Sequence, residues 1–348
     1  MKTPKLDYPV HTLDNQLLLP AGTELTPEAL DELIASNKDA SYRSVSFLNY
    51  DTVFQDMLNI LQKPPYNIIF KRLNEEAIFT VTKNIRFIQP VLEFLDYFKE
   101  KDFYTYKHSL VVFGLSINLA QDLLEKPPDD IIELMAGTLH DFGKICVPLR
   151  ILKKSNPLTR TSKNVLEHHA LAGFVLLGYF LQDYRSFAAQ VAKEHHERKD
   201  GSGYPLGISL QDKMVEIIAV CDVYDALLSP RPYRPTPFDN RTALEEITEM
   251  AKKGKFSLEV VQALVSQNRK DKPHFRDCKI SSEKRGIPPP DSIYGVIVDK
   301  EIICPNCHSS SIKKKKPKDG RGQIQYECRG CGKEFDEDDL INIDIEKH

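Results

Sequence analysis

The chain has 348 residues, of which 41% are hydrophobic and 28% are charged, and this composition indicates a soluble globular protein of two or three domains. The formal net charge of −3 argues against a surface that binds nucleic acid over its whole extent, although it leaves room for local patches of charge. The sequence lacks both a run of about eighteen apolar residues, which would predict a membrane-spanning helix, and an apolar N-terminal stretch long enough for a secretory signal.

Residues 1–90 are predicted to form an N-terminal module with a regulatory or dimerising role, so a homodimer is one expected arrangement. Within this module, Thr26 stands directly before Pro27 and Glu28, which is the pattern of a capped helix start. The segments 67–73 and 77–88 carry β-branched and aromatic residues, and both strands and short helices are compatible with them. The sequence contains no pattern that identifies what this module would sense.

The next segment, residues 91–270, is predicted to be an all-α bundle. Apolar residues recur there at spacings of three and four, with breaks at the glycine- and proline-rich stretches 200–207 and 229–237. The predicted helices cover residues 92–100, 108–125, 129–145, 165–181, 184–197, 214–228 and 243–253. Short connections between many amphipathic helices favour a helical bundle. Residues 271–299 are predicted to be a linker, and residues 300–348 a cysteine-bearing module with an acidic tail.

Six of the ten histidines lie between residues 108 and 196, and three of them belong to two conspicuous pairs. His140-Asp141 is expected near the end of one apolar helix, and His195-His196 at the end of another. Asp222 falls in an apolar helix, where an unpaired carboxylate would cost several kcal/mol to bury, so a cation is its expected partner. Imidazole and carboxylate are ligands of divalent transition metals. Spacing alone leaves a metal site and a set of ordinary, non-ligating histidines about equally open; the four other histidines, His11, His274, His308 and His348, are interpreted as ordinary side chains.

Five sequence blocks carry a more specific signal, and they occur in the order TYKHS, LHDFGKICVP, EHHALAGFVLL, HHERKDGSGYP and AVCDVYDALLSPRPYR. Together they resemble the HD-GYP family of bacterial cyclic-dinucleotide phosphodiesterases, a subgroup of the HD metal-dependent phosphohydrolases. The resemblance covers about residues 95–270. It implies a mostly α chain with an HD-type all-helical catalytic bundle, and divalent metals, iron or manganese, as cofactors.

Carried over by motif, the resemblance implies two groups of metal ligands that share Asp141. The first metal would be held by His108, His140, Asp141 and Asp222, and the second by Asp141, His169, His195 and His196. His169 is chosen over His168 because it stands four positions before Gly173, as the family pattern requires, and His168 is expected at the surface. Some members hold a third metal through a glutamate at the position of Tyr104, so two metals are expected here.

The resemblance also implies the residues that meet the substrate. Asp141 and Lys144 would be catalytic, with Lys144 contacting a phosphate, and Arg231 and Arg234 would bind phosphate through their guanidinium groups. Asp225 would line the pocket. Tyr204 would stack on a base or pack its own loop. Glu197 and Asp200 are expected to support this corner rather than bind metal.

The expected activity is hydrolysis of cyclic di-GMP to the linear dinucleotide pGpG or on to GMP. Another cyclic dinucleotide, such as cyclic GMP-AMP, belongs to the same class and stays open. A receptor that binds a cyclic dinucleotide without turnover is a second hypothesis, although receptors derived from enzymes commonly lose ligands and all seven are present. The resemblance also implies diguanylate cyclases as protein partners.

The C-terminal module contains two C-x-x-C pairs, and 20 residues separate Cys307 from Cys328. Cys304, Cys307, Cys328 and Cys331 therefore predict one structural zinc ion in a β-type zinc ribbon. Lysines 313–316, with Lys318 and Arg321, would form a basic hairpin tip. Nucleic-acid binding at this tip, in a phosphohydrolase whose ribbon delivers the substrate, is a third hypothesis. Paired cysteines of this kind suit a reducing compartment, so the protein is expected in the cytoplasm.

Overall fold

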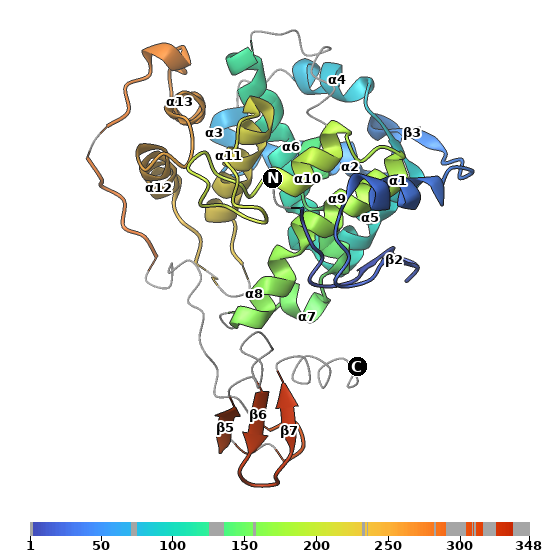
Figure 1. Ribbon diagram of the computed structural model, residues 1–348. Coiled ribbons are helices and arrows are strands. Elements are labelled where there is room, and N and C mark those ends of the chain that lie inside the picture. Colours follow the sequence, from blue (N-terminus) through green and yellow to red (C-terminus); the bar gives the residue numbers. More distant parts are fainter. Residues whose placement is uncertain are drawn as a thin grey trace. The chain divides into compact units, whose positions relative to one another are not determined.

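A computed structural model of the chain describes residues 3–70, 75–124, 136–155, 158–231, 234, 236–281, 283–289, 304–307, 309, 311–315 and 325–336. The chain divides into two compact units. One consists of Met1–Asn156 with Val165–Tyr294, and the other of Pro157–Asn164 with Gly295–His348. The first unit is helical and the second contains the cysteine pairs (Figure 1).

The N-terminal part of the first unit mixes short strands with short helices. Strands β1 (Val10–His11) and β2 (Leu17–Leu19) form an antiparallel hairpin, and β3 (Ser44–Ser46) pairs antiparallel with β4 (Arg86–Ile88). The helices are α1 (Pro27–Ala35), η1 (Phe47–Asn49), α2 (Val53–Leu61), α3 (Asn67–Phe70) and α4 (Glu75–Lys83). Thr26 accepts a hydrogen bond from the N–H of Ala29, which confirms the predicted cap of α1. The ambiguous segment 77–88 contains both the end of a helix and a strand.

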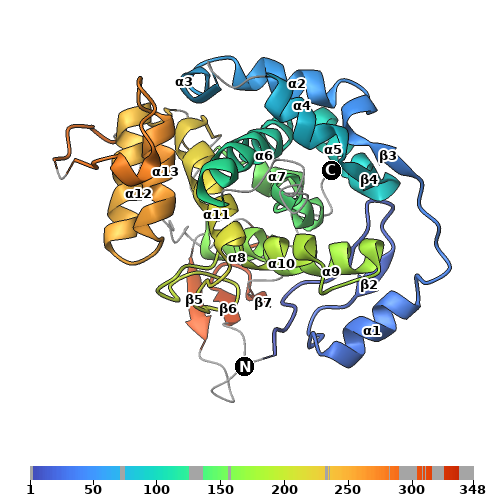
Figure 2. The same ribbon diagram turned by 90° about the horizontal axis from the view of Figure 1, so that it is seen from above.

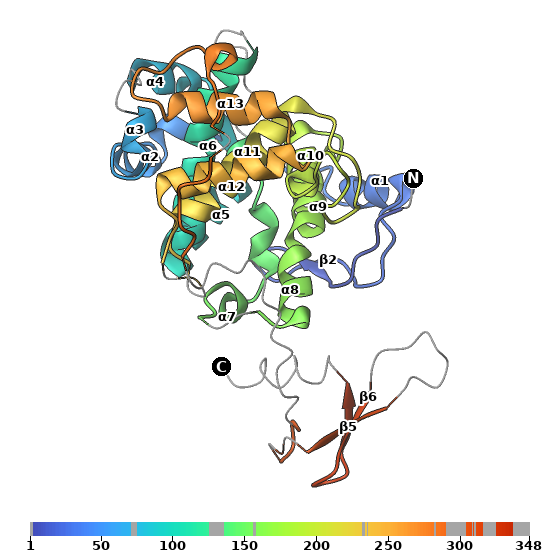
Figure 3. The same cartoon turned by 90° about the vertical axis from the view of Figure 1, so that its left-hand side faces the viewer.

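The remainder of the first unit is helical, which confirms the predicted mostly α fold. Its elements are α5 (Gln89–Lys101), α6 (Phe103–Leu124), η4 (Phe142–Cys146), α7 (Leu149–Leu152), α9 (His169–Leu181), α10 (Phe187–Glu194), α11 (Lys213–Leu228), α12 (Asn240–Lys252), α13 (Leu258–Gln267) and η5 (Phe275–Asp277), together with the end of α8 (Arg160–Glu167), whose first residues belong to the second unit. In Figure 2, α6, α11, α10 and α9 follow one another around the centre of the unit, and Figure 3 shows α12 beside α13. Within the described residues, every helix is too short or too polar to cross a membrane.

A single hydrophobic core joins the N-terminal elements to the helical bundle. It extends from Leu6 and Val10 through α6, α9 and α11 to Phe275. The helix α1 packs on α9, and the amide of Asn37 donates to the carbonyl of Tyr179 at 2.9 Å. Residues 1–90 therefore pack directly against the helices that carry the predicted ligands, while the role of these residues stays a prediction.

The segment that contains His140 and Asp141 is not the end of an α-helix, so that prediction is wrong. Residues 136–138 form a 3-10 turn, both ligands lie in the turn that follows, and η4 begins at Phe142. A Cβ atom on Gly143 would lie within 3.0 Å of the carbonyl oxygen of His169 and of Gly173, so glycine permits η4 to pack against α9.

The second unit contains a small three-stranded antiparallel sheet in the order β5 (Ile312–Lys315), β6 (Gln325–Cys328) and β7 (Glu334–Asp336) (Figure 1). Its core consists of Tyr326 and Phe335, with ring centroids 5.7 Å apart, beside two of the cysteines. The predicted basic tip beyond Lys315 and the acidic tail from residue 337 lie outside the described residues.

Candidate metal centre

The structure brings together all seven residues that the sequence proposes as ligands. They form two groups whose ligand atoms lie within 4.8 Å of one another. One group is His108, His140 and Asp222, and the other is Asp141, His169, His195 and His196. The ligands come from α6, from the turn before η4, from the start of α9, from the end of α10 and from α11. Packing of these elements around the unit's centre therefore builds the site.

Asp141 lies between the two groups, and its two carboxylate oxygens face different ones. Oδ1 is 3.4 Å from Nε2 of His169 and 4.0 Å from Nε2 of His195. Oδ2 is 3.3 Å from Nε2 of His140 and 3.5 Å from Nε2 of His108. A carboxylate in this position can bind one cation with each oxygen, which is the arrangement of a bridging ligand.

Four histidines turn the same ring nitrogen toward Asp141 because the other nitrogen is held from behind. Nδ1 of His140 bonds the carbonyl of Gly137 at 2.8 Å, Nδ1 of His169 bonds that of Leu166 at 2.5 Å, and Nδ1 of His195 bonds that of Val191 at 3.0 Å. A carbonyl only accepts, so each of these nitrogens carries the proton and each Nε2 presents a lone pair. His108 is held in the same way by a carboxylate. Outer partners of this kind fix the orientation of ligating histidines.

The donor set fits divalent metal ions. Nε2 of His140 lies 3.2 Å from Nε2 of His108, and Nε2 of His169 lies 3.3 Å from Nε2 of His195. Where both nitrogens of a pair present lone pairs, they repel one another unless a cation lies between them. Imidazole with carboxylate suits iron, manganese, nickel or zinc. The HD-type ligand set is therefore complete, and the identity of the metal stays open.

The charges at the site favour deprotonated ligands. Burial opposes ionisation of Asp141, but Lys144 and His140 outweigh it and hold the pKa of this carboxyl well below its usual range. Burial lowers the pKa of His169 to about 4 and that of His195 to about 3, so both imidazoles are neutral at pH 7. His108 differs, because hydrogen bonds to Asp222 and Asp225 outweigh burial and raise its pKa to about 9.

Asp225 lies behind His108, away from the metal-facing side. It is fully buried, and Oδ2 lies 2.5 Å from Nδ1 of His108. Its other oxygen accepts from the hydroxyl of Tyr66 and, at 3.2 Å, from that of Ser229. The sequence resemblance expects Asp225 to line the pocket, but these contacts make it the carboxylate that orients His108. Sequence reasoning missed Tyr66, which stands directly before α3 and belongs to none of the sequence motifs.

Lys144 and His196 mark the side on which the site reaches solvent. The side chains of the central histidines are at most 2% exposed, whereas Lys144 is 12% and His196 is 17% exposed. Nζ of Lys144 lies 2.5 Å from Oδ2 of Asp141. The ring of Tyr204 stacks on His196, with centroids 4.4 Å apart. Lys144 and Tyr204 are both partly exposed and lie at this edge of the site, and contact of either residue with a substrate stays a prediction.

The two predicted phosphate-binding arginines differ in their surroundings. Arg231 is half-buried and lies over the ring of Tyr104 at 5.4 Å, and Tyr104 in turn stacks parallel to His108 at 5.8 Å. Arg234 is 4% exposed and donates to the carbonyls of Ala226, Leu227 and Ser229. The guanidinium of Arg234 thus binds carbonyls at the carboxyl end of α11, and its contact with phosphate stays a prediction.

The loop that follows His195-His196 is organised by Glu197, which confirms the expectation that this residue supports the corner. Its buried carboxylate accepts from the backbone N–H groups of Leu206 at 2.7 Å, and of Gly207 and Ile208 at 3.1 Å. A Cβ on Gly203 would overlap the backbone of His196 and Glu197, so glycine lets the loop return against the ligands. Tyr204 reaches His196 as a result.

His168 joins neither group of ligands, but it is not at the surface as expected. Its side chain is 7% exposed and packs edge-on against Tyr8, with ring centroids 5.4 Å apart. Burial lowers its pKa to about 4. The surface prediction is wrong because a residue from the N-terminal end of the chain covers it.

The four cysteines of the second unit also converge. Sγ of Cys304 lies 3.5 Å from Sγ of Cys331, Sγ of Cys307 lies 3.5 Å from Sγ of Cys328, and all four sulfurs fall within 4.8 Å. A backbone N–H bond at Lys333 lowers the pKa of Cys331 to about 6, which favours a thiolate. The set suits a tetrahedral zinc ion, which stays a prediction.

Comparison with known families identifies the segment that carries the histidine and aspartate ligands. A family described as "HD domain" matches residues 96–260. Residues 96–260, slightly less than half of the chain, are therefore similar to an HD domain. The match begins within α5 and ends within α13, so the HD domain includes both groups of ligands and the loop with Gly203 and Tyr204.

Curated relatives of this HD domain carry related names. A "cyclic di-GMP phosphodiesterase" of Pseudomonas aeruginosa is 39% identical over 175 residues, which is 48% of this chain and 40% of that protein. Another of that name from Thermotoga maritima is 35% identical over 194 residues, or 55% of this chain and 51% of that protein. A "3'3'-cGAMP-specific phosphodiesterase" of Vibrio cholerae is 35% identical over 146 residues, covering 41% and 31%. The chain thus spans about half or less of each relative's length.

A solved structure also aligns with the chain. It is described as an HDG"Y"P protein from Bdellovibrio bacteriovorus, with 16% identity and a TM-score of 0.40. The alignment covers 75% of this chain and 94% of that one.

Proposed function

We propose that this chain is a metal-dependent phosphodiesterase that hydrolyses cyclic di-GMP to pGpG, to GMP or to both. The observation that carries the proposal is the position of Asp141, whose two oxygens face two separate groups of histidines. The names of the relatives from Pseudomonas and Thermotoga support the choice of substrate. Two divalent cations held by these seven ligands would supply Lewis-acid stabilisation of the phosphate and a nucleophilic water at neutral pH.

The side chains around the ligands have separate parts in this proposal. Lys144, beside Asp141 at the accessible edge, would bind a non-bridging phosphate oxygen and stabilise the charge that grows on it. Arg231 would contribute a second cation from above Tyr104. Tyr204, stacked on His196, would offer a ring face to a guanine base. Asp225 and Arg234 would act indirectly, by orienting His108 and by holding the end of α11.

A direct test is to incubate protein loaded with Mn(II) or Fe(II) with cyclic di-GMP and to follow the products by chromatography. The Asp141→Ala variant is the control for the metal centre, and Tyr8→Phe is a matched control that removes one hydroxyl from a residue outside both groups of ligands. We expect turnover in wild type and Tyr8→Phe and none in Asp141→Ala. Binding of cyclic di-GMP by the metal-loaded wild type without any turnover would favour the receptor hypothesis instead.

Cyclic GMP-AMP is a second candidate substrate, because relatives in Vibrio cholerae are named as specific for it. Competition between the two cyclic dinucleotides in one assay would rank them by the ratio of their kcat/KM values. We further propose a cytoplasmic location, on the basis of the cysteine pairs that suit a reducing compartment. Dimerisation, contact with diguanylate cyclases and nucleic-acid binding by the ribbon stay predictions.

A further inference from the structure

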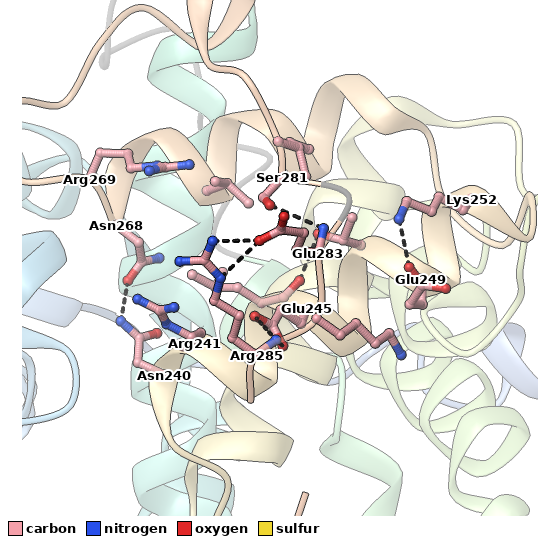
Figure 4. A pocket seen from close by; sticks show the side chains of 15 residues that line it. Asn240, Arg241, Glu245, Glu249, Lys252, Asn268, Arg269, Ser281, Glu283 and Arg285 are labelled. Carbon is pink, nitrogen blue, oxygen red and sulfur yellow. Dashed lines mark hydrogen bonds and ion pairs between the residues drawn. The ribbon is translucent and has the colours of Figure 1, made fainter. Parts of the chain in front are cut away.

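A cavity lies between α12, α13 and the segment that follows η5, and none of the proposed ligands lines it. Its volume is about 400 Å³, and Figure 4 shows its polar lining. Cavities of about 300–1,000 Å³ accommodate small organic ligands. The cavity is thus large enough for a small ligand that is separate from the substrate proposed for the metal centre.

The carboxylates that line this cavity already have partners. Glu249 accepts from Lys252 at 2.7 Å. Glu283 accepts in the same way from the guanidinium of Arg285 at 2.5 Å. Glu245 accepts from the backbone N–H groups of residues 285 and 286, at 3.1 and 2.8 Å, and so attaches the segment after η5 to α12. Two of these three carboxylates therefore have a cationic partner, and the third is held by backbone N–H groups.

Two arginines of the lining are not compensated. Within the part of the chain that the structure describes, neither Arg241 nor Arg269 forms an ion pair, and Arg269 gives one hydrogen bond to the carbonyl of Lys279 at 3.2 Å. Both lie beside the bonded pair Asn240 and Asn268 at one end of the cavity (Figure 4). Guanidinium groups that line one cavity attract an anion, and their planar donors match a phosphate group in particular.

The cavity also presents apolar surface. Leu244, Val265 and Ile280 contribute to the lining. A ligand that satisfies both features carries a phosphate at one end and a flat ring system that covers aliphatic side chains. A mononucleotide has this chemistry, and an inorganic phosphate ion has only half of it.

A hydrogen-bonded relay connects the arginine end of the cavity to α11. The hydroxyl of Tyr224 lies 2.5 Å from Oδ1 of Asn240 and 3.0 Å from Oδ1 of Asn268, and the amide of Asn240 donates to Asn268 at 2.8 Å. Tyr224 is fully buried on α11, between the proposed ligand Asp222 and the orienting Asp225. A hydroxyl has one proton, so Tyr224 can donate to only one of the two oxygens at a time. A ligand that engages either asparagine would decide which bond forms.

We propose that this cavity is a regulatory site for a mononucleotide, whose phosphate is clamped by Arg241 and Arg269. Binding is transmitted through Asn240 and Asn268 to Tyr224, and so to the metal ligands on α11. The site is separate from the proposed reaction, and its occupancy can be measured whether or not the chain turns over a cyclic dinucleotide.

Calorimetric titration of the full chain with GMP, and separately with inorganic phosphate, tests the site. The titrations use an Asp141→Ala background, so that nucleotide bound through the bridged metals is not counted. When Arg241→Ala and Arg269→Ala are both added to this background, we expect GMP binding to weaken at least about tenfold, because two charge-assisted contacts are lost. Arg160→Ala, which removes an exposed arginine outside the cavity, should leave binding unchanged. The proposal of a mononucleotide ligand would be wrong if the two arginine substitutions left the affinity for GMP unchanged. It would also be wrong if inorganic phosphate bound as tightly as GMP.

The relay is tested with Tyr224→Phe, which keeps the ring and removes only the hydroxyl. In the chain with its metal ligands intact, saturating GMP should change the affinity for Mn(II) by at least about threefold, as expected for coupled sites. Tyr224→Phe should bind GMP within about twofold of wild type and abolish that change. An Mn(II) affinity that is the same with and without bound GMP in wild type would refute the transmission to α11.

Discussion

Replacing Asp225 by asparagine perturbs the metal centre without touching a proposed ligand. The carboxylate is fully buried and bonds Nδ1 of His108 at 2.5 Å, while the hydroxyls of Tyr66 and Ser229 occupy its other oxygen. Asparagine keeps the shape and can still accept from His108, so the variant removes chiefly the negative charge. His108 then becomes a weaker and less firmly oriented ligand.

The expected loss of metal affinity follows from the weakening of the hydrogen bond between Asp225 and His108. A buried hydrogen bond to a charged group contributes about 1.5–3 kcal/mol, against about 1 kcal/mol for a neutral pair. The His108 bond alone therefore loses roughly 0.5–2 kcal/mol, and removal of such outer partners typically costs about 10–100-fold in metal affinity. We expect Asp225→Asn to weaken Mn(II) binding by about tenfold at the site that includes His108.

Titration of Mn(II) against a competing chelator, with the ribbon's cysteines saturated with zinc, measures this effect. Tyr66→Phe is the matched control, because it removes a partner of Asp225 but leaves the charge that faces His108. Its Mn(II) affinity should fall by less than that of Asp225→Asn. If Asp225→Asn binds both Mn(II) ions within about twofold of wild type, the idea that Asp225 orients a metal ligand is wrong.

Four further changes probe other parts of the molecule. Gly143→Ala places a methyl group against the carbonyl of His169, so both groups of ligands should separate, with lower metal content by elemental analysis and a lower Tm. Glu197→Gln weakens three hydrogen bonds that shape the loop, and steady-state kinetics on cyclic di-GMP should show KM rising more than kcat falls. Hydrogen bonds from Tyr106 and Lys99 outweigh burial and lower the pKa of Asp56, so its stabilisation is fully present above the unfolded pKa of about 4 and is lost as the pH falls through the lower folded pKa. Thermal scans should show Asp56→Asn less stable than wild type at pH 7, and the difference in Tm should shrink as the pH falls below about 4. Cys328→Ser removes one of four sulfurs, and zinc content should fall while Mn(II) binding in the helical unit persists, whereas loss of both would contradict two independent sites.

The sequence was sufficient to propose the metal ligands, but it did not predict the backbone geometry that brings them together. His169, His195, His196 and Asp222 could be assigned because each stands in a motif whose order the chain preserves. The turn at His140-Asp141 could not be predicted, because the apolar pattern around it suits a helix equally well. Its actual shape depends on the close approach of Gly143 to α9, which is a tertiary contact.

Contacts between residues far apart in the sequence could not be predicted from local sequence patterns. Tyr66 contacts Asp225 across 159 positions of sequence, and Tyr66 stands in none of the motifs. His168 is covered by Tyr8, again through a contact that no local period encodes. Arg234 stands in a proline-rich break that reads as an exposed loop, and only the packing of that loop shows its guanidinium on the carbonyls of α11.

The proposed phosphodiesterase activity depends most directly on Asp141 as the ligand that two metal ions share. Anomalous diffraction from crystals grown with Mn(II) would locate each ion without reference to activity. We expect two manganese peaks in the HD domain, one beside each oxygen of Asp141, and one zinc peak among the four cysteines. A single manganese peak in the HD domain, or two peaks that do not share Asp141, would contradict the account.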